Sequence, residues 1–190
     1  MNPLMQKLAP NAADIIRSDH SQVMVLFHRY KSSSTPAAKK AVVAGVCLAL
    51  EIHAQVEEEI FYPALRVAAG PVVEQLVPEH DEMRRLIGEL RAMDPGAPGY
   101  DATFMTLMRA VIHHVADEET QLLPDAERVL GYRLTELGVE MTKRRLQLMA
   151  PHSREIALTK ARNLPKGGIA LAAGALLAGA LVARGFRRIS

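Results

Sequence analysis

Apolar residues recur at helical spacing through the first 150 residues, in segments separated by proline, glycine and short polar runs. Spacings of three, four, seven and eight place such residues on one face of a helix. They predict helices at about 12–31, 36–69, 72–93, 102–130 and 134–149. The expected fold is therefore all-α: an up-down four-helix bundle with extra C-terminal helical segments.

Helix-starting and helix-breaking residues set these boundaries. Thr35 followed by Pro36 reads as an N-cap with proline at the first helical position. The GP pair at 70–71 should stop the second helix, and Pro78 should break or kink the start of the third. Asp101 is expected to cap the fourth helix, which the glycine at 131 closes.

One polar signature occurs twice within these apolar segments. HAQVEEEIFYP at 53–63 and HVADEETQLLP at 114–124 share His, two Glu and Pro at the same offsets. In each, the first Glu lies four residues after the His, so both side chains share a helix face. Two such matches among seven histidines are hard to ascribe to accident.

The preceding helices complete a longer repeat. His20 stands 33 residues before His53, and His80 stands 34 before His114; each follows an acid, Asp19 or Glu79. The chain thus reads as one αα-hairpin written twice. Each His lies in the apolar stripe of its helix, so the bundle should bring together four imidazoles and two carboxylates: His20, His53, Glu57, His80, His114 and Glu118.

Such a cluster is costly to bury without a cation, because the carboxylates repel and lose their hydration. Divalent metals would neutralise them and use the imidazoles. Mixed nitrogen and oxygen ligation suits non-haem iron, with manganese or zinc as weaker candidates. The size of the ligand set favours two metals over one.

This order of residues resembles the hemerythrin-like, or HHE cation-binding, family over about residues 12–150. The resemblance implies a four-helix bundle with a non-haem di-iron centre, terminal imidazoles from the four histidines, and Glu57 and Glu118 as bridging carboxylates. The sequence also departs from oxygen-carrying hemerythrins. They have a further His where this chain has Arg84, and Met24 holds the matching place in the first helix. Their second carboxylate motif is usually HxxxxD.

Other polar residues receive simpler interpretations. His28, His113 and His152 are expected to be ordinary surface or hydrogen-bonded histidines. Glu58 and Glu119 are expected to pair with basic residues such as Arg84 or to support the ligands from outside. The single cysteine excludes an intramolecular disulfide and suits a reducing compartment.

The C-terminal part differs in charge and hydropathy. From His152 onward seven basic residues face one acid, giving +6, and residues 1–151 are left at −4. Residues 151–166 read as a polar, basic linker. Residues 167–190 read as a hydrophobic C-terminal helix whose uncharged run, 167–183, makes it a candidate membrane anchor near the short limit for spanning. The alternative is a soluble packing or oligomerising helix.

The sequence therefore predicts a hemerythrin-like di-iron protein that binds or reacts with O2, NO or peroxide. Sensing, detoxification by a peroxide- or NO-consuming enzyme, and iron handling all stay open. The alternative is a metal-stabilised adaptor without redox activity. With no secretory signal, the protein is expected to be cytoplasmic, and the C-terminal helix is a candidate for tethering it to membrane lipid. Because the bundle is net acidic, no nucleic-acid partner is expected. The sequence leaves the oligomeric state open.

Overall fold

The computed structural model describes residues 10–152 of this protein, and within them the chain is helical apart from short connections. The elements in chain order are α2 (Ala12–Arg29), α3 (Pro36–Val56), η1 (Glu57–Phe61), α4 (Tyr62–Ala92), α5 (Tyr100–Asp117), η2 (Glu118–Leu122), α6 (Leu123–Leu130), α7 (Arg133–Met149) and η3 (Ala150–His152). η1 and η2 are π-helical turns inside otherwise continuous helices. The all-α class predicted from the sequence is confirmed.

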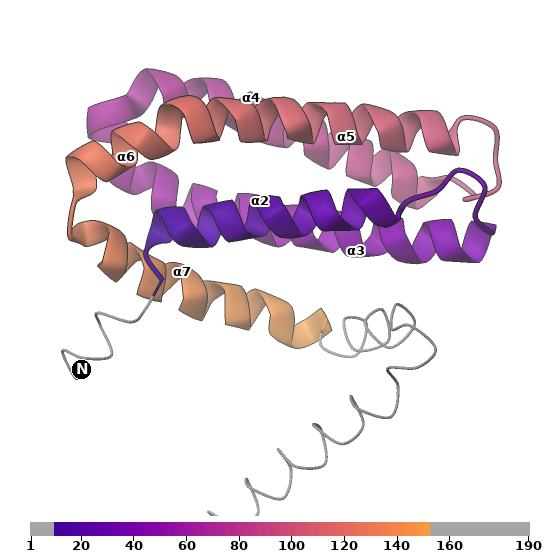
Figure 1. The fold of residues 1–190 in the computed structure, drawn as a ribbon, viewed down its shortest axis with the longest axis horizontal. Helices are drawn as coiled ribbons and strands as arrows, with labels where there is room; N and C mark the ends of the chain where they lie inside the picture. Colours follow the sequence, from indigo (N-terminus) through magenta and orange to yellow (C-terminus); the bar gives the residue numbers. More distant parts are fainter. Residues whose placement is uncertain (1–9, 153–190) are drawn as a thin grey trace, which may run out of the picture. The chain divides into compact units, whose positions relative to one another are not determined.

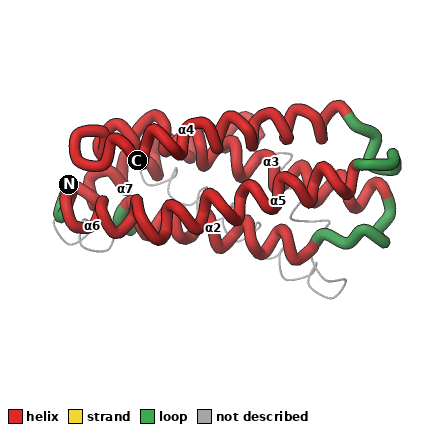
Figure 2. Tube along the Cα trace, turned by 90° about the horizontal axis from the view of Figure 1, so that it is seen from above, coloured by secondary structure: helices red, strands yellow, loops and turns green. Residues whose placement is uncertain are grey.

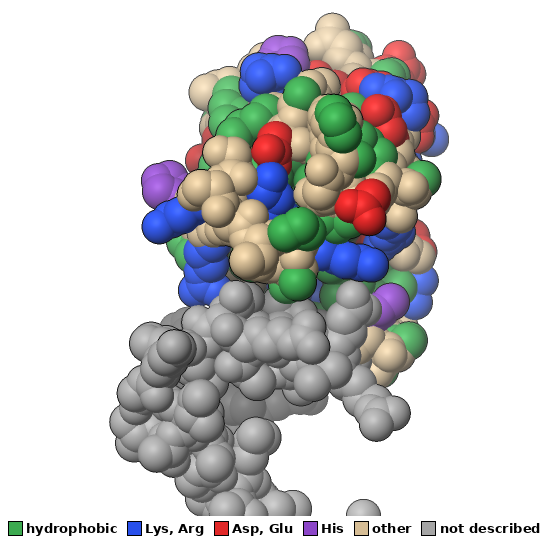
Figure 3. Space-filling model, turned by 90° about the vertical axis from the view of Figure 1, so that its right-hand side faces the viewer, with side chains coloured by type: hydrophobic (Ala, Val, Ile, Leu, Met, Phe, Trp, Pro, Cys, Tyr) green, Lys and Arg blue, Asp and Glu red, His purple; other side chains and the backbone are tan. Residues whose placement is uncertain are grey.

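The helices form four rods: α2; α3 with η1 and the start of α4; the rest of α4 after Ala69; and α5 with η2 and α6. The rods lie side by side as an up-down bundle (Figures 1 and 2). α2 packs on α3, and α4 packs on α5, so each predicted hairpin is a neighbouring pair. α7 lies against α2 and α3 as a fifth helix beside the bundle. On the face drawn in Figure 3, acidic and basic side chains are interspersed with apolar ones.

The second predicted helix ends where expected, at Ala69, but it is not one regular α-helix. Its α-helical part, α3, ends at Val56, and the π-turn η1 carries the chain into α4 without a loop. α4 runs through Pro71 and Pro78 to Ala92, and Ala69 is the residue within it with non-helical dihedral angles (φ −135°, ψ 32°). The break thus lies at Ala69, one residue before Gly70, and the chain turns back there (Figure 1). Pro78 does not break the helix.

The caps are partly as expected. The Thr35 side chain accepts a hydrogen bond from the Ala38 backbone N–H at 3.3 Å. Asp101, in contrast, is not the cap of α5. That place belongs to Gly99, whose φ of 96° lies in the left-handed region that glycine adopts without strain. Asp101 lies in the first helical turn and instead accepts a hydrogen bond from Lys39 Nζ at 2.7 Å.

The apolar core consists of two clusters with a polar layer between them. One cluster contains Ile16, Leu76 and Leu122; the other contains Val23, Met83 and Val111. Along α2 and α4 the change from one cluster to the other falls at His20 and at His80. The predicted ligands therefore occupy a cross-section of the bundle that apolar side chains close on both sides.

The expected membrane anchor at 167–183 lies outside the described residues, as does most of the predicted linker. Among residues 10–152, every helix falls short of the length and apolarity that crossing a membrane requires.

Candidate metal centre

Each rod of the bundle contributes to one buried polar layer. α2, α3, α4 and α5 supply one imidazole each, and η1 and η2 supply one carboxylate each at their first residues. All six side chains are buried, with His80, Glu57 and Glu118 fully so. The structure thus brings together all six residues predicted from the sequence: His20, His53, Glu57, His80, His114 and Glu118.

The two glutamates begin the two π-helical turns. The backbone N–H of Tyr62 donates to the carbonyl oxygen of Glu57, and that of Leu123 donates to Glu118, five residues back in each case. A proline follows directly, Pro63 or Pro124. In a regular α-helix its ring would clash with the carbonyl four residues earlier, and the extra residue of the π-turn relieves that clash. In both copies of the repeated signature, the proline therefore goes with the π-turn that begins at the carboxylate residue.

The imidazoles direct their Nε2 atoms at the two glutamates. His20 Nε2 lies 3.1 Å and His114 Nε2 3.6 Å from Glu118 Oε2. His53 Nε2 lies 3.3 Å and His80 Nε2 3.4 Å from Glu57 Oε2. Nitrogen and oxygen donors therefore converge within a few ångströms.

Two outer carboxylates come from the residue after each ligand glutamate. Glu58 Oε1 accepts a hydrogen bond from His80 Nδ1 at 2.8 Å, and Glu119 Oε1 accepts one from His20 Nδ1 at 2.9 Å. These contacts match the supporting role expected for both residues. Arg84 also donates to Glu58, at 2.5 Å. These hydrogen bonds keep the pKa of Glu58 at about 2, against the effect of its partial burial.

Two more outer carboxylates come from the residues just before His20 and His80. Glu79 Oε2 accepts a hydrogen bond from His114 Nδ1 at 2.9 Å, and Asp19 Oδ2 lies 3.7 Å from His53 Nδ1. Sequence reasoning noticed both acids beside a histidine but gave them no role. The repeated acid–His pair could have indicated this supporting role. Each acid, however, contacts the histidine of the neighbouring helix and not the one beside it in the sequence.

A metal fits this arrangement on the protein's own chemistry. Imidazoles that hold a metal usually donate their second ring N–H to a carboxylate, as seen here at Nδ1. His80 Nε2 and His114 Nε2 are then lone-pair acceptors 3.0 Å apart, a contact that a shared cation would make favourable. Within the described residues, two overlapping groups of side chains could each hold an ion: His53, Glu57, His80 and His114, and His20, His53, Glu57 and Glu118.

Glu57 gives the clearest sign that this layer suits a cation. Both its carboxylate oxygens are buried without a hydrogen-bond partner. No other buried side-chain nitrogen or oxygen of the described residues lacks one. Burial and the charge of Glu118 raise the pKa of Glu57 to about 8. Burial also acts on Glu118, but the hydrogen bond from His20 and nearby imidazoles bring its pKa to about 2. The two carboxyl groups thus lie in unequal surroundings, with the pKa of Glu57 shifted upward and that of Glu118 downward.

Tyr62 is a further residue of the centre that sequence reasoning missed. Its hydroxyl donates to Glu118 Oε1 at 2.8 Å and lies 3.5 Å from His80 Nε2. Its ring stacks on that imidazole with 5.6 Å between centroids. The second copy of the motif has Leu123 at this place, so the hydroxyl makes the two halves chemically unequal.

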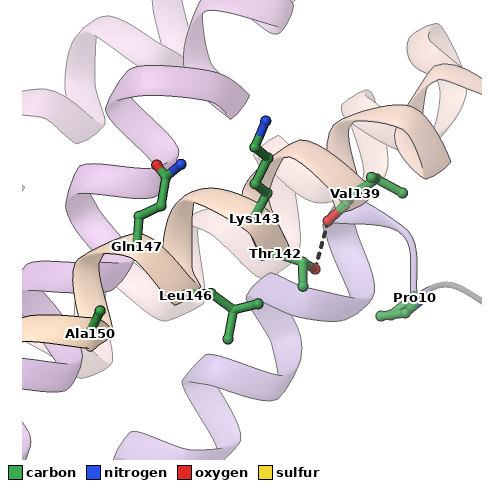
Figure 4. Close-up of a pocket in the computed structure, with 8 residues that line it drawn as sticks. Pro10, Val139, Thr142, Lys143, Leu146, Gln147 and Ala150 are labelled. Carbon is green, nitrogen blue, oxygen red and sulfur yellow. Dashed lines mark hydrogen bonds between the residues drawn. The ribbon is translucent and has the colours of Figure 1, made fainter. Parts of the chain in front are cut away.

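The remaining polar residues lie outside the layer. Arg84, at the place of the further histidine of oxygen carriers, points to Glu58 and Asp81. His113 is 70% exposed beside Asp117, and His28 contacts the carbonyl of its own helix, which agrees with the ordinary roles expected for them. A hollow of about 660 Å³ lies along α7, from Pro10 past Leu146 to Ala150 (Figure 4). None of the six predicted ligands lines it.

The fold and the buried histidine and glutamate cluster define a metal-binding helical bundle. The family described as the hemerythrin HHE cation binding domain matches residues 11–126, and the chain belongs to it. α7 lies beyond the matched residues.

Individual relatives agree with this assignment. A protein named "DNA nickase" from Nostoc sp. is 32% identical over 127 residues, covering 66% of this chain. The match spans 36% of that protein's own length. Uncharacterized protein Rv2633c of Mycobacterium tuberculosis is 25% identical over 144 residues, covering 73% of this chain and 87% of the relative. The crystal structure of an HHE domain protein from Mycobacterium kansasii, an Rv2633c homolog, shares the fold with a TM-score of 0.65 at 23% identity, over 84% of this chain and 97% of that one.

Proposed function

We propose that this chain is a hemerythrin-like non-haem di-iron protein that binds or reacts with O2, NO or peroxide. The observation that carries the proposal is the orphaned carboxylate of Glu57, held against imidazole Nε2 atoms in a closed layer. A fully buried carboxylate without a hydrogen-bond partner costs roughly 1–3 kcal/mol or more, and a bound cation would remove that cost.

In this proposal the four histidines would hold the ions through Nε2, together with the carboxylates of Glu57 and Glu118. Iron bound there would supply one-electron redox steps and open coordination positions for a small ligand. The outer carboxylates fix the ring orientation and make the imidazoles stronger donors. The two apolar clusters restrict access of water from either end of the bundle.

The replacement of the further histidine bears on which reaction is favoured. Arg84 is held outside the layer by Glu58, so it adds no ligand to the centre. Two ions would then be held by six side chains, one imidazole fewer than in an oxygen carrier. Tyr62 supplies a hydroxyl donor on one side of the centre. We therefore propose turnover or sensing of peroxide or NO ahead of reversible O2 carriage.

The second candidate is a metal-stabilised adaptor in which the cation serves folding alone. The closed polar layer favours this reading equally, because a cation there would stabilise the bundle whatever its redox behaviour. We propose for both candidates a cytoplasmic location, with lipid contact through residues 167–190.

Metal content and optical spectra decide between the two. The chain is purified with iron, and absorption is recorded for the reduced protein before and after addition of O2, H2O2 or NO. We expect about two irons per chain and spectral changes with at least one of these ligands, both lost in Glu57→Ala and Glu118→Ala. A folded chain that binds no iron, or one inert zinc, would leave the adaptor in front.

A further inference from the structure

α7 reaches the metal centre from outside the bundle. Arg145, on this fifth helix, contacts the Asp19 carboxylate through Nη1. The other oxygen of Asp19 lies 3.7 Å from Nδ1 of His53. A single carboxylate thus links a predicted ligand to an element beyond the residues that the family matches.

The contact is unlike those of the other three imidazoles. Their outer carboxylates lie at 2.8–2.9 Å from Nδ1. Asp19 is farther from its imidazole and is buried, with 8% of its surface exposed. Among the four outer carboxylates of the described chain, it is the one that a guanidinium from outside the four rods contacts. The charge-assisted contact with the guanidinium of Arg145 holds this buried carboxylate in place beside the imidazole of His53.

α7 is also closely docked where it crosses α2. A Cβ at Gly138 would lie 2.4 Å from the carbonyl oxygen of Pro10, so the backbones approach more closely there than an alanine permits. Arg144, the neighbour of Arg145, makes a second ion pair with Glu59 at 2.5 Å. Glu59 contacts no imidazole in the described structure; its other partner is Gln55. The two arginines therefore offer similar docking contacts but only one leads to the centre.

We propose that Arg145 is a positioning residue: it fixes Asp19, which orients the imidazole of His53, so that docking of α7 controls how firmly the adjoining cation is held. The part of this inference that concerns a cation rests on the proposed metal site. The orientation of His53 itself does not.

The test compares Arg145→Met with Arg144→Met. Methionine keeps an aliphatic stem on α7 and removes the charge. Co²⁺ is loaded into the full chain, its visible spectrum is recorded, and its transfer to EDTA is timed. Loss of an outer support of a metal-ligating histidine typically lowers metal affinity about 10–100-fold. We expect Arg145→Met to shift the visible bands and to speed transfer about tenfold or more, and Arg144→Met to stay within about twofold of the wild type.

Two further variants separate orientation from docking. Asp19→Asn should reproduce the effect of Arg145→Met, and the double variant should add little, because both act through one link. Arg145→Lys should restore part of the wild-type behaviour. Equal effects of Arg144→Met and Arg145→Met, with unshifted bands, would overturn the proposal and reduce both residues to docking contacts.

A metal-free measurement distinguishes this inference from the proposed function. In chelator-treated protein, the ring nitrogen chemical shifts of His53 and His114 are measured by NMR. Arg145→Met should move those of His53 and leave those of His114, whose partner is Glu79, in place. Failure of the wild type to take up Co²⁺ would refute the metal site while this readout still decides on Arg145. Unchanged His53 shifts would overturn the proposal.

Discussion

Tyr62 occupies the place in the first motif that Leu123 holds in the second, and it adds a hydroxyl to an otherwise matching interior. Tyr62→Phe removes the donor to Glu118 and leaves the ring stacked on His80. Because a buried carboxylate then loses a hydrogen bond, we expect the free energy of unfolding of the chelator-treated protein to fall by about 1–3 kcal/mol. Urea unfolding followed by circular dichroism measures this change.

Tyr132→Phe is the control for this comparison, because its side chain is largely solvent-exposed. It should leave the urea midpoint unchanged. Equal destabilisation by the two substitutions would show that the Tyr62 hydroxyl has no special part in the polar layer.

At this scale the sequence predicted the six residues at the centre of the layer, because helical periodicity alone decides which side chains share a face. It could not predict which outer carboxylate supports which histidine. Glu119 and His20 are 99 positions apart, and the choice of partner depends on how the rods pack. For the same reason Tyr62 was not singled out from the sequence.

Among the elements, the four rods and the caps at Thr35 and Gly131 were predictable from local residue preferences. The π-turns were not, although the prolines at 63 and 124 marked their ends. A π-turn adds one residue to a single helical turn. The apolar spacing on either side of it stays helical, so the sequence pattern does not show the insertion. The GP pair at 70–71 did indicate the break at Ala69. The cap at Gly99, in contrast, depends on backbone geometry that a glycine allows but does not specify.

Close packing of α7 at Gly138 predicts that a Gly→Ala substitution there destabilises the fold, the opposite of its usual effect in a helix. In an open helical position, Gly→Ala stabilises by about 0.4–1 kcal/mol. At Gly138 the added Cβ would meet the backbone around Pro10, so we expect Gly138→Ala to lower the free energy of unfolding by about 1–3 kcal/mol. Thermal and urea unfolding measure both effects.

Gly88→Ala supplies the matched control. Gly88 lies in α4, and a Cβ there meets nothing within 4 Å, so this variant should gain stability. If Gly138→Ala were also stabilised, the close approach of α7 to the start of α2 would not exist in solution.

For the molecule as a whole, a polar layer that divides the apolar core makes stability depend on pH. In the metal-free protein the pKa of Glu57 is about 8 against an ordinary 4.5. Burial lowers the pKa of His20, but hydrogen bonds to Glu118 and Glu119 outweigh it and raise the value from 6.5 to about 9. Between about pH 5 and 9 the folded state thus binds more protons than the unfolded chain. The free energy of unfolding should therefore fall as pH rises through this range.

Urea unfolding in the presence of a chelator at pH 5, 7 and 9 checks this dependence. Glu57→Gln removes one of the two titrating groups and should flatten the curve. Bound metal should reverse the trend, since cations compete with protons for the same ligand atoms. A metal-free protein that gained stability from pH 5 to 9 would contradict the assigned protonation.

The outer carboxylates connect the two hairpins in an alternating order. Asp19 and Glu79 serve the histidine of their own hairpin, whereas Glu58 and Glu119 serve a histidine of the other. Two identical copies of one hairpin, joined as a symmetric dimer, would therefore supply every inner and outer group of the layer. The two halves of this chain are not equivalent, however: Tyr62 has Leu123 at the matching place, and Asp19 alone among the four outer carboxylates contacts Arg145.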